Sequence, residues 1–277
     1  MKIIECPRDA MQGIRNFIPT KEKINYINQL LKVGFDTIDF GSFVSNKTIP
    51  QLRDTAEVLS GLNLDCSSSK LLSIIANKRG AEIACSFDEI NYLGFPLSIS
   101  EQFQNRNTNK TIDESLILLE KIKNLSDKKN KEIVVYLSMA FGNPYGEIYH
   151  PDIVASIADK LNKFDIKIIA LSDTIGVSTD SNISPLFSTL ISEYPTIEFG
   201  AHFHSTSNNW QEKVASAYEN GCRRFDSALK GLGGCPMAKD DLVGNIPTEK
   251  IASYFYDHLD LNDHELSKSL KLADLVF

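Results

Sequence analysis

Cysteines are scarce in this sequence, and their spacing forms no paired motif. Its 277 residues contain no CxxC motif and only five cysteines, which are Cys6, Cys66, Cys85, Cys222 and Cys235. An odd number of cysteines without paired spacing argues against a disulfide framework and against a zinc knuckle. We therefore expect free thiols in a reducing compartment.

The chain also lacks long apolar runs and an excess of basic residues. No stretch reaches the roughly 18 apolar residues that a membrane-spanning helix needs, and the N-terminal MKIIECPRDA has no apolar signal core. Lys and Arg total 29 against 36 Asp and Glu, for a formal net charge of -7. General nucleic-acid binding requires a dense basic face. We expect a cytoplasmic protein that binds neither nucleic acid nor a membrane.

The sequence does contain a regular alternation of β-rich and helical segments. Hydrophobic residues make up 42% and charged residues 23%, as in a globular protein. Several β-rich runs are apolar on both faces, which is typical of parallel strands that helices cover. The eight strand candidates are residues 2–6, 36–40, 64–68, 82–87, 132–139, 166–172, 197–204 and 222–227.

Helical patterns fill the intervals between these candidates. Apolar residues recur at helical spacing in residues 21–34, 111–125 and 151–164. Eight βα units predict an α/β fold of the TIM (β/α)8 barrel type, whereas a doubly wound sheet would leave strands unassigned. Barrels of this type commonly have the length of this chain. We therefore predict a single catalytic domain over residues 1–277.

Glycines and one polar segment indicate boundaries within this pattern. Gly34, Gly80 and Gly221 stand shortly before strand candidates, where a residue in the left-handed conformation often ends a helix. Residues 91–110 are polar, rich in Asn and Gln, and without periodicity. We predict that they form a long loop after strand four.

Polar side chains gather where the predicted strands end. Catalytic groups of a TIM barrel lie at the C-terminal strand ends, where this sequence places the pair Arg8 and Asp9, then Asp173, then His202 and His204. Residues two apart on a strand face the same side, so the two imidazoles of AHFH can reach one cation. With carboxylates from other strands, they predict a site for Mg²⁺ or Mn²⁺ more than a closed thiolate site for zinc. The alternative is a pair of histidines that only form hydrogen bonds.

Two residues have more than one interpretation. Arg8 can stabilise the charge of a developing enolate next to a cation, or it can form a salt bridge with Asp9. Cys235 lies among glycines in GLGGCPMA, where it can be a small apolar loop residue, half of a disulfide or a reactive thiol. The local sequence leaves these alternatives open.

Taken together, the motifs resemble the 3-hydroxy-3-methylglutaryl-CoA (HMG-CoA) lyases, within the metal-dependent TIM-barrel lyases and acyl-CoA carboligases. The resemblance spans nearly the whole chain in the family's order, and SFVS with GLGGCP points to the lyase branch. The matching stretches are CPRDAMQ (6–12), IDFGSFVSNKTIPQ (38–51), SDTIGV (172–177), AHFH (201–204), GLGGCPMA (231–238) and GNIPTE (244–249).

The resemblance implies a set of ligands and a reaction. Asp9, His202, His204 and Asn245 look like the ligands of a divalent cation, and Arg8 looks like the residue that stabilises an enolate. The reaction implied is the cleavage of HMG-CoA into acetyl-CoA and acetoacetate. A base removes the tertiary hydroxyl proton, the Cα–Cβ bond breaks, and the enolate gains a proton. Asp9 and His202 are both candidates for the base.

The resemblance also implies roles for residues outside the ligand set. Cys235 would lie on a mobile loop over the site and protonate the enolate, in keeping with glycines that permit tight turns and loop closure. Asp173 matches a functional aspartate close to the metal. Gln12, within the matching PRDAMQ segment, is expected to contact the substrate.

An acyl-CoA substrate would need basic contacts for its phosphates. Arg15, Lys47 and Lys70 follow predicted strands one, two and three, on the face of the predicted active site. The alternative is that these are ordinary surface residues in loops. The resemblance further suggests a homodimer.

The sequence departs from the family pattern at three places. Asp39 stands where the family has a glutamate, which shortens the side chain by one methylene. Ser205 follows the HFH motif where the family has an aspartate, so it cannot supply the carboxylate that usually orients a ligating imidazole. The third predicted strand ends in CSSSK, without the family's proline and asparagine. These departures keep the implied ligands but bear on substrate recognition.

Two other functions are compatible with parts of this pattern. A related aldolase, lyase or carboligase would keep the cation and the enolate but use a different hydroxy-acid substrate. A barrel that binds metal or acyl-CoA without turnover is a different class, and the complete ligand set argues against it. Substrate tests separate these alternatives.

Overall fold

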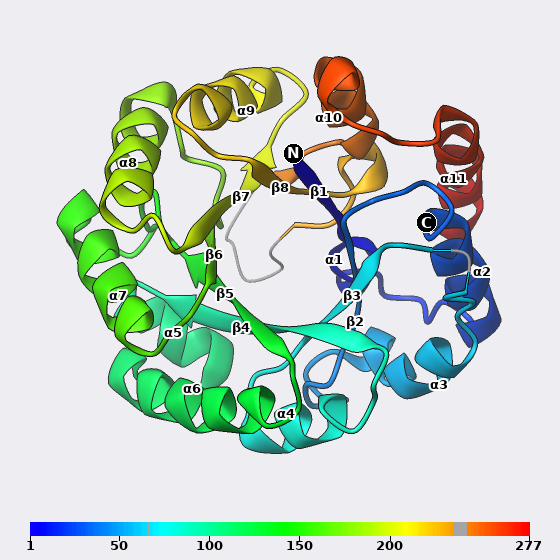
Figure 1. Cartoon of the computed structure of the whole chain (residues 1–277), viewed down its shortest axis with the longest axis horizontal. Helices are drawn as coiled ribbons and strands as arrows, with labels where there is room; N and C mark the ends of the chain where they lie inside the picture. Colours follow the sequence, from blue (N-terminus) through cyan, green and yellow to red (C-terminus); the bar gives the residue numbers. More distant parts are fainter. Residues whose placement is uncertain (66, 235–242) are drawn as a thin grey trace.

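The structure is a closed barrel of parallel strands surrounded by helices (Figure 1). This computed structural model describes residues 1–65, 67–234 and 243–277. The barrel strands are β1 (Lys2–Glu5), β2 (Thr37–Ser42), β3 (Lys70–Ile74), β4 (Ile90–Ser98), β5 (Glu132–Ser138), β6 (Ile168–Asp173), β7 (Glu198–Ser205) and β8 (Arg224–Ser227). Each strand pairs with its neighbours in sequence order, and β1 also pairs with β8, which closes the ring. The predicted TIM barrel is confirmed.

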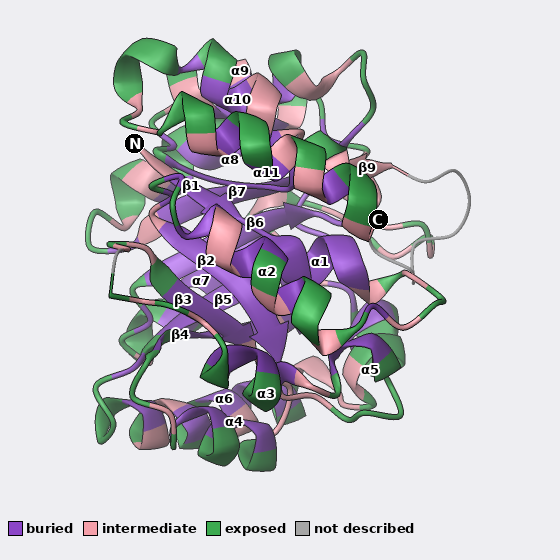
Figure 2. Cartoon of the chain, turned by 90° about the vertical axis from the view of Figure 1, so that its right-hand side faces the viewer, coloured by how far each residue is buried: buried purple, intermediate pink, exposed green. Residues whose placement is uncertain are grey.

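Helices cover the outside of this ring, with buried inner faces and exposed outer faces (Figure 2). The short strand β9 (Gly244–Asn245) pairs antiparallel with β7. The α-helices are α1 (Pro7–Gln12), α2 (Thr20–Leu30), α3 (Thr55–Ser60), α4 (Lys78–Ala84), α5 (Glu101–Thr108), α6 (Ile112–Asp127), α7 (Pro151–Lys163), α8 (Asp180–Glu193), α9 (Trp210–Glu219), α10 (Thr248–Tyr254) and α11 (Asp263–Val276). Short 3-10 helices are η1 (Pro50–Leu52), η2 (Leu229–Gly231) and η3 (Tyr256–His258).

Two of the eight predicted strands lie elsewhere in the structure. Residues 64–68 precede the third strand, which is β3 (Lys70–Ile74). Residues 82–87 belong to the end of α4 and the turn after it. Helix α4 begins where the Asn77 side chain accepts a hydrogen bond from the Gly80 amide at 2.8 Å. This cap, together with the exposed outer face of the helix, decides for helix over strand.

The prediction of a long loop at residues 91–110 is also wrong. This segment contains most of β4, followed by α5. Ser100 caps the first turn of α5 by accepting a hydrogen bond from the Phe103 amide at 3.1 Å. The polar composition reflects an exposed helix, because only Phe103 and Gln104 of α5 are buried. Polarity therefore indicated exposure and not the lack of regular structure.

The predicted glycine positions are confirmed at two of three sites. Gly34 and Gly221 follow α2 and α9 with φ of +94° and +97°, a conformation that favours glycine. Gly80 instead lies inside α4, where a Cβ would meet the Phe43 carbonyl oxygen at 2.5 Å. Glycine is therefore needed at position 80 because the chain after β2 packs closely against it.

Polar and apolar side chains divide the interior of the barrel. A small apolar cluster on one side consists of Leu72, Tyr92, Val134, Tyr136, Ile168 and Ala170. His202 of β7, whose ring packs edge-on against Tyr136 of this cluster, is in register with Asp226 of β8. His204 follows two residues after His202 and so shares its face. Among the described residues, no helix is long and apolar enough to cross a bilayer.

Candidate metal centre

Asp9 reaches the end of the barrel because a helix begins immediately after β1. Pro7 occupies the first turn of α1, where its missing amide hydrogen costs nothing. Arg8 and Asp9 follow in the same turn, and both are buried. The PRD motif therefore places a guanidinium and a carboxylate at the C-terminal end of the barrel.

Asp9, His202 and His204 form a compact cluster at this end. One ligand atom from each residue lies within 4.8 Å of the other two. Asn245 of β9 joins them because β9 pairs with β7 at His204. The Asn245 side chain donates a hydrogen bond to Asp9 Oδ2 at 2.6 Å. All four residues for which the sequence predicted a metal site are thus brought together.

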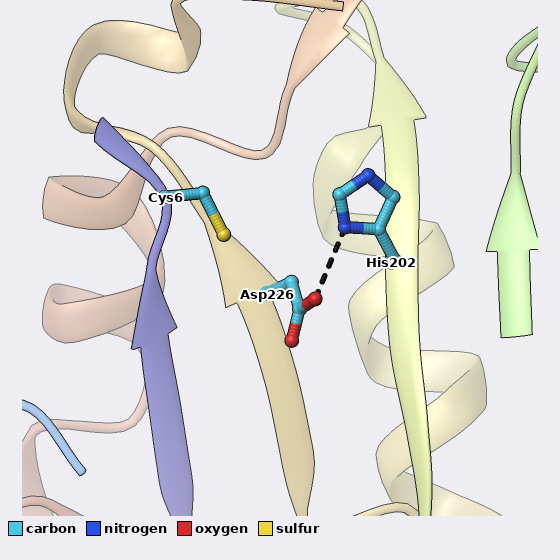
Figure 3. Close-up of side chains that lie close together, drawn as sticks. All are labelled: Cys6, His202 and Asp226. Atoms are coloured by element: carbon cyan, nitrogen blue, oxygen red, sulfur yellow. Dashed lines mark hydrogen bonds and ion pairs between the residues drawn. The ribbon is translucent and has the colours of Figure 1, made fainter. Parts of the chain in front are cut away.

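Each of the two histidines uses one ring nitrogen in a hydrogen bond and directs the other toward the cluster. His204 Nδ1 lies 2.9 Å from the carbonyl oxygen of Thr174, so Nδ1 carries the proton and Nε2 carries the lone pair. His202 Nδ1 lies 3.1 Å from Asp226 Oδ2 (Figure 3). Asp226 therefore provides the orienting carboxylate that Ser205 cannot, as is usual for metal-ligating histidines.

The donor atoms fit a divalent cation. Among the described residues, His204 Nε2 and Asn245 Oδ1 are buried without a hydrogen-bond partner. Buried polar atoms are rarely left unpaired, and both atoms belong to the predicted ligands. Two imidazoles with carboxylate and amide oxygens suit an ion that completes its coordination with water or substrate.

Electrostatics favour the ligand forms of Asp9 and His204. Burial alone would raise the pKa of Asp9, but the Arg8 guanidinium and the two imidazoles lower it to about 2. Burial, reinforced by the positive charge of His202, lowers the pKa of His204. A carboxylate and a neutral imidazole are the forms that bind a cation.

Arg8 is held between two carboxylates next to the cluster. Its Nη1 donates to Asp9 Oδ1 at 2.8 Å, and its Nε and Nη2 both donate to Asp39 Oδ2. The shorter Asp39 side chain therefore still reaches the guanidinium. Burial raises the pKa of Asp39 to about 6, although the pairing with Arg8 opposes this shift. The salt-bridge interpretation of Arg8 is thus confirmed, and Arg8 also lines the pocket.

A pocket of about 290 Å³ opens above the cluster. Gln12, predicted to contact substrate, lines it together with Arg8, Asp9 and the two histidines. The pocket extends outward between the loops after several strands. Its more distant walls include Val44, Ser45, Thr48, Asn77, Asn107 and Lys110.

Asp173 lies near the centre but outside the cluster. Its Oδ2 accepts hydrogen bonds from Lys213 Nζ and the Ser178 hydroxyl, both at 2.6 Å. Lys213 also donates to the His204 carbonyl oxygen at 2.9 Å. The Asp173–Lys213 pair therefore fixes the backbone of His204. The carbonyl group of Thr174, the residue after Asp173, forms a hydrogen bond with the His204 ring. Asp173 supports the cluster through these neighbours.

Comparison with known proteins identifies the family. The family model described as HMGL-like matches residues 2–276. The chain belongs to the HMGL-like family. Hydroxymethylglutaryl-CoA lyase YngG of Bacillus subtilis (strain 168) is 33% identical over 271 residues, covering 98% of this chain and 89% of that protein. The cytoplasmic 3-hydroxy-3-methylglutaryl-CoA lyase of Rattus norvegicus is 31% identical, covering 100% of this chain and 80% of that protein.

Solved structures of HMG-CoA lyases share the fold. The Bacillus subtilis enzyme superposes with a TM-score of 0.92 at 31% identity, covering 99% of this chain and 92% of that chain. An HMG-CoA lyase from Acinetobacter baumannii, in complex with coenzyme A and 3-methylmalate, gives 0.91 at 31% identity, covering 100% and 90%. The resemblance inferred from the motifs is confirmed.

The glycines before Cys235 run beside the candidate metal centre of this HMGL-like protein. Gly233 has φ of +89°, and a Cβ there would lie 2.8 Å from both Asn245 Nδ2 and the Asp9 carbonyl oxygen. Asn245 also donates to the Leu232 carbonyl oxygen at 2.8 Å. Only glycine allows this approach. Cys235 itself lies outside the described residues.

The predicted phosphate contacts lie in different places. Arg15 and Lys47 are exposed and are not among the described residues that line the pocket. Lys70 begins β3, so it lies at the opposite, N-terminal end of the barrel, which corrects its expected place. That error follows from placing the third strand too early. Lys110 was missed because residues 91–110 were taken as an undifferentiated loop.

Proposed function

We propose that this chain is a divalent-cation-dependent lyase that cleaves HMG-CoA into acetyl-CoA and acetoacetate. The observation that carries the proposal is the cluster of Asp9, His202 and His204, with Arg8 beside it, at the base of the pocket in an HMGL-like barrel. The curated relatives described above are named as lyases of this substrate. They give no support to a carboligase or to a barrel without turnover.

Mg²⁺ or Mn²⁺ would be held by Asp9, His202, His204 and Asn245. Such a cation supplies Lewis-acid polarisation of substrate oxygens and a template for their orientation. The support is the set of unpaired buried donor atoms in this cluster and the lowered pKa of Asp9. Asp226 and the Thr174 carbonyl would keep the two imidazoles in the ligating orientation.

Arg8 would stabilise the negative charge of the thioester enolate as the Cα–Cβ bond breaks. It is buried in the pocket wall and fixed by Asp39 and Asp9, so little reorganisation is needed when charge develops. We assign Asp39 the role of positioning Arg8. Gln12 shares this network, because it accepts from Arg8 Nη1 at 3.0 Å and donates to Asp9 Oδ1 at 2.7 Å.

Cys235 would donate the proton that converts the enolate into acetyl-CoA. This role is supported by Gly233, two residues earlier, which packs on Asp9 and Asn245. We assign the base role to neither earlier candidate. Asp9 is a weak base because its pKa is lowered to about 2, and His202 has one ring nitrogen on Asp226 and faces the cluster with the other.

The rest of the pocket would receive the acyl-CoA substrate. Among the described residues of the outer pocket wall, Lys110 is the basic one, and we propose that it attracts a CoA phosphate. Arg15 and Lys47 are exposed on the same side of the barrel and complete this assignment. A homodimer rests on the family resemblance alone. A cytoplasmic location is supported by Cys6, Cys85 and Cys222, which form no disulfide.

The proposal is tested by incubating the purified protein with HMG-CoA and Mg²⁺ or Mn²⁺. We expect stoichiometric release of acetyl-CoA and acetoacetate, loss of activity with EDTA, and recovery when the cation is restored. Failure to release acetyl-CoA from HMG-CoA, together with cleavage of another 3-hydroxyacyl-CoA, would contradict the substrate assignment.

A further inference from the structure

A second group of potential ligands lies behind the cation cluster. Cys6, His202 and Asp226 offer a sulfur, a nitrogen and a carboxylate oxygen, each within 4.8 Å of the other two. Cys6 follows β1, and Asp226 and His202 lie on the adjoining strands β8 and β7. Figure 3 shows the thiol and the imidazole on either side of the Asp226 carboxylate. We call these three residues the thiol cluster.

The polar groups of the thiol cluster are incompletely paired. Among the described residues, Asp226 Oδ1 and the neighbouring Tyr136 hydroxyl are buried without a partner. The Tyr136 ring packs edge-on against His202, with 5.5 Å between ring centroids. The Cys6 thiol donates a hydrogen bond to the Ile4 carbonyl oxygen at 3.6 Å, and its sulfur lone pairs stay available to an ion. Buried groups of this kind normally have partners, so the thiol cluster has donor atoms to offer an ion.

The donor set selects a different ion from the cluster above it. Thiolate, imidazole and carboxylate are ligands of Zn²⁺, whereas Mg²⁺ prefers oxygen. The His202 Nδ1 and Asp226 Oδ2 atoms are 3.1 Å apart. Two ligands at about 2.0 Å from a tetrahedral ion are separated by roughly 3.3 Å. The His202 and Asp226 atoms therefore already lie near the spacing of two zinc ligands.

We propose that Cys6, His202 and Asp226 bind Zn²⁺, and that this ion weakens cation binding at Asp9, His202 and His204. Binding breaks the S–H bond of Cys6 and forms an Sγ–zinc bond, and the thiol proton passes to the solvent. The Nδ1 proton of His202 moves to Nε2 when the upper site is empty, or passes to the solvent when Nε2 holds a cation. The hydrogen bond between His202 and Asp226 is replaced by a bond from each residue to the ion. No group is oxidised or reduced. The thiol cluster is thus an inhibitory site for a thiophilic dication.

Antagonism follows from the shared imidazole. His202 would present Nε2 to the upper cation and Nδ1 to the zinc ion, which places two like charges on opposite sides of one ring. By thermodynamic linkage, each ion then lowers the affinity of the other by the same factor. This second half of the proposal rests on the proposed cation site, whereas zinc binding by Cys6 does not.

The binding site is tested by titrating the metal-free protein with Co²⁺, a spectroscopic substitute for Zn²⁺, without substrate. We expect a thiolate-to-cobalt charge-transfer band in the near ultraviolet from the wild-type protein. The band should be lost in both Cys6→Ala and Cys6→Ser and retained in Cys235→Ala, with circular dichroism confirming that each variant is folded. A band that persists without Cys6, or no band in the wild type, would overturn the proposal.

The antagonism is tested by measuring Mn²⁺ affinity by electron paramagnetic resonance, with and without one equivalent of Zn²⁺. Because zinc can also compete directly at the upper cluster, Cys6→Ala serves as the matched control. We expect zinc to weaken Mn²⁺ binding at least about tenfold more in the wild type than in Cys6→Ala, in line with the 10- to 100-fold cost of disturbing a ligand's orienting contact. An equal effect in both proteins would refute antagonism, while the cobalt band would still report on zinc binding.

Discussion

Charged side chains occupy both ends of the barrel, but their surroundings differ. At the C-terminal end Arg8, Asp9 and Asp39 are almost completely buried and in mutual contact. At the N-terminal end Lys2 pairs with Glu198, and these side chains are 40% and 31% exposed. Water screens the exposed pair, whereas the buried charges depend on one another. Substitutions at the two ends should therefore have very different consequences.

The largest difference is expected between Arg8→Ala and Lys2→Ala. Loss of Arg8 should lower kcat about 10²- to 10³-fold, as for an oxyanion-hole donor, and leave Asp39 buried without its cation. Lys2→Ala should change the unfolding free energy by less than about 1 kcal/mol and leave turnover intact. Steady-state kinetics and urea unfolding measure both effects. A stable Arg8→Ala protein with normal kinetics would refute the enolate-stabilising role.

A second contrast concerns the pH dependence of stability. Burial raises the pKa of Glu5 from 4.5 to about 8, although hydrogen bonds from Thr248 and the Leu229 amide oppose the shift. The folded state therefore holds the Glu5 proton more tightly than the unfolded state. The associated stability is fully present below pH 4.5 and is lost as pH rises through about 8.

Glu5→Gln should remove this pH dependence. Relative to the wild type, it should gain about 4 kcal/mol of unfolding free energy between pH 5 and pH 8.5, measured by urea unfolding at both values. Glu132→Gln, at the exposed start of β5, is the matched control and should change stability by less than about 1 kcal/mol at either pH. Parallel pH profiles of Glu5→Gln and the wild type would show that Glu5 is not held protonated.

Asp226→Asn should have an intermediate effect on the proposed metal centre. It removes the charge that orients His202, so Mn²⁺ affinity should fall about 10- to 100-fold while Asp9 and His204 remain in place. Glu132→Gln removes a carboxylate from the N-terminal end of the barrel and should leave the affinity unchanged. Calorimetric titration with Mn²⁺ compares the two variants. Equal affinities would dismiss the orienting role of Asp226.

The smallest contrast is expected between two lysines. Lys110→Ala, on the pocket wall, should raise the KM for HMG-CoA up to about fivefold, equivalent to about 1 kcal/mol. Lys70→Ala, at the far end of the barrel, should leave KM unchanged. The effect of Lys110→Ala should shrink as salt is added, because an exposed charge pair is screened. A larger effect at Lys70 would contradict the placement of the CoA phosphates.

The sequence predicted the features that short motifs determine. HFH on one strand and PRD after another were enough to predict the cluster of Asp9, His202 and His204, because a barrel brings its strand ends together. Six of the eight strand candidates overlap the observed strands. Residues 82–87 and 91–110 were assigned wrongly because helix caps and outward-facing polar residues decided those segments.

Side-chain contacts between different βα units could not be read from the sequence. Asp226 stands in a strand candidate, but its pairing with His202 depends on the register between β7 and β8. Lys213 reaches Asp173 from α9, across the gap between two βα units. Neither residue lies in a motif that the sequence singled out. The alternation rule does put Arg224 and Asp226 on one face of β8, which is the signal that could have indicated an inward carboxylate.

The most direct test of the metal centre is an Mn²⁺ titration of the metal-free protein, followed by electron paramagnetic resonance. We expect one tightly bound Mn²⁺ per chain in the wild type and loss of that binding in His204→Ala, with the fold retained. Unchanged Mn²⁺ binding by folded His204→Ala would show that the cation is held elsewhere and would contradict the assignment of Asp9, His202, His204 and Asn245.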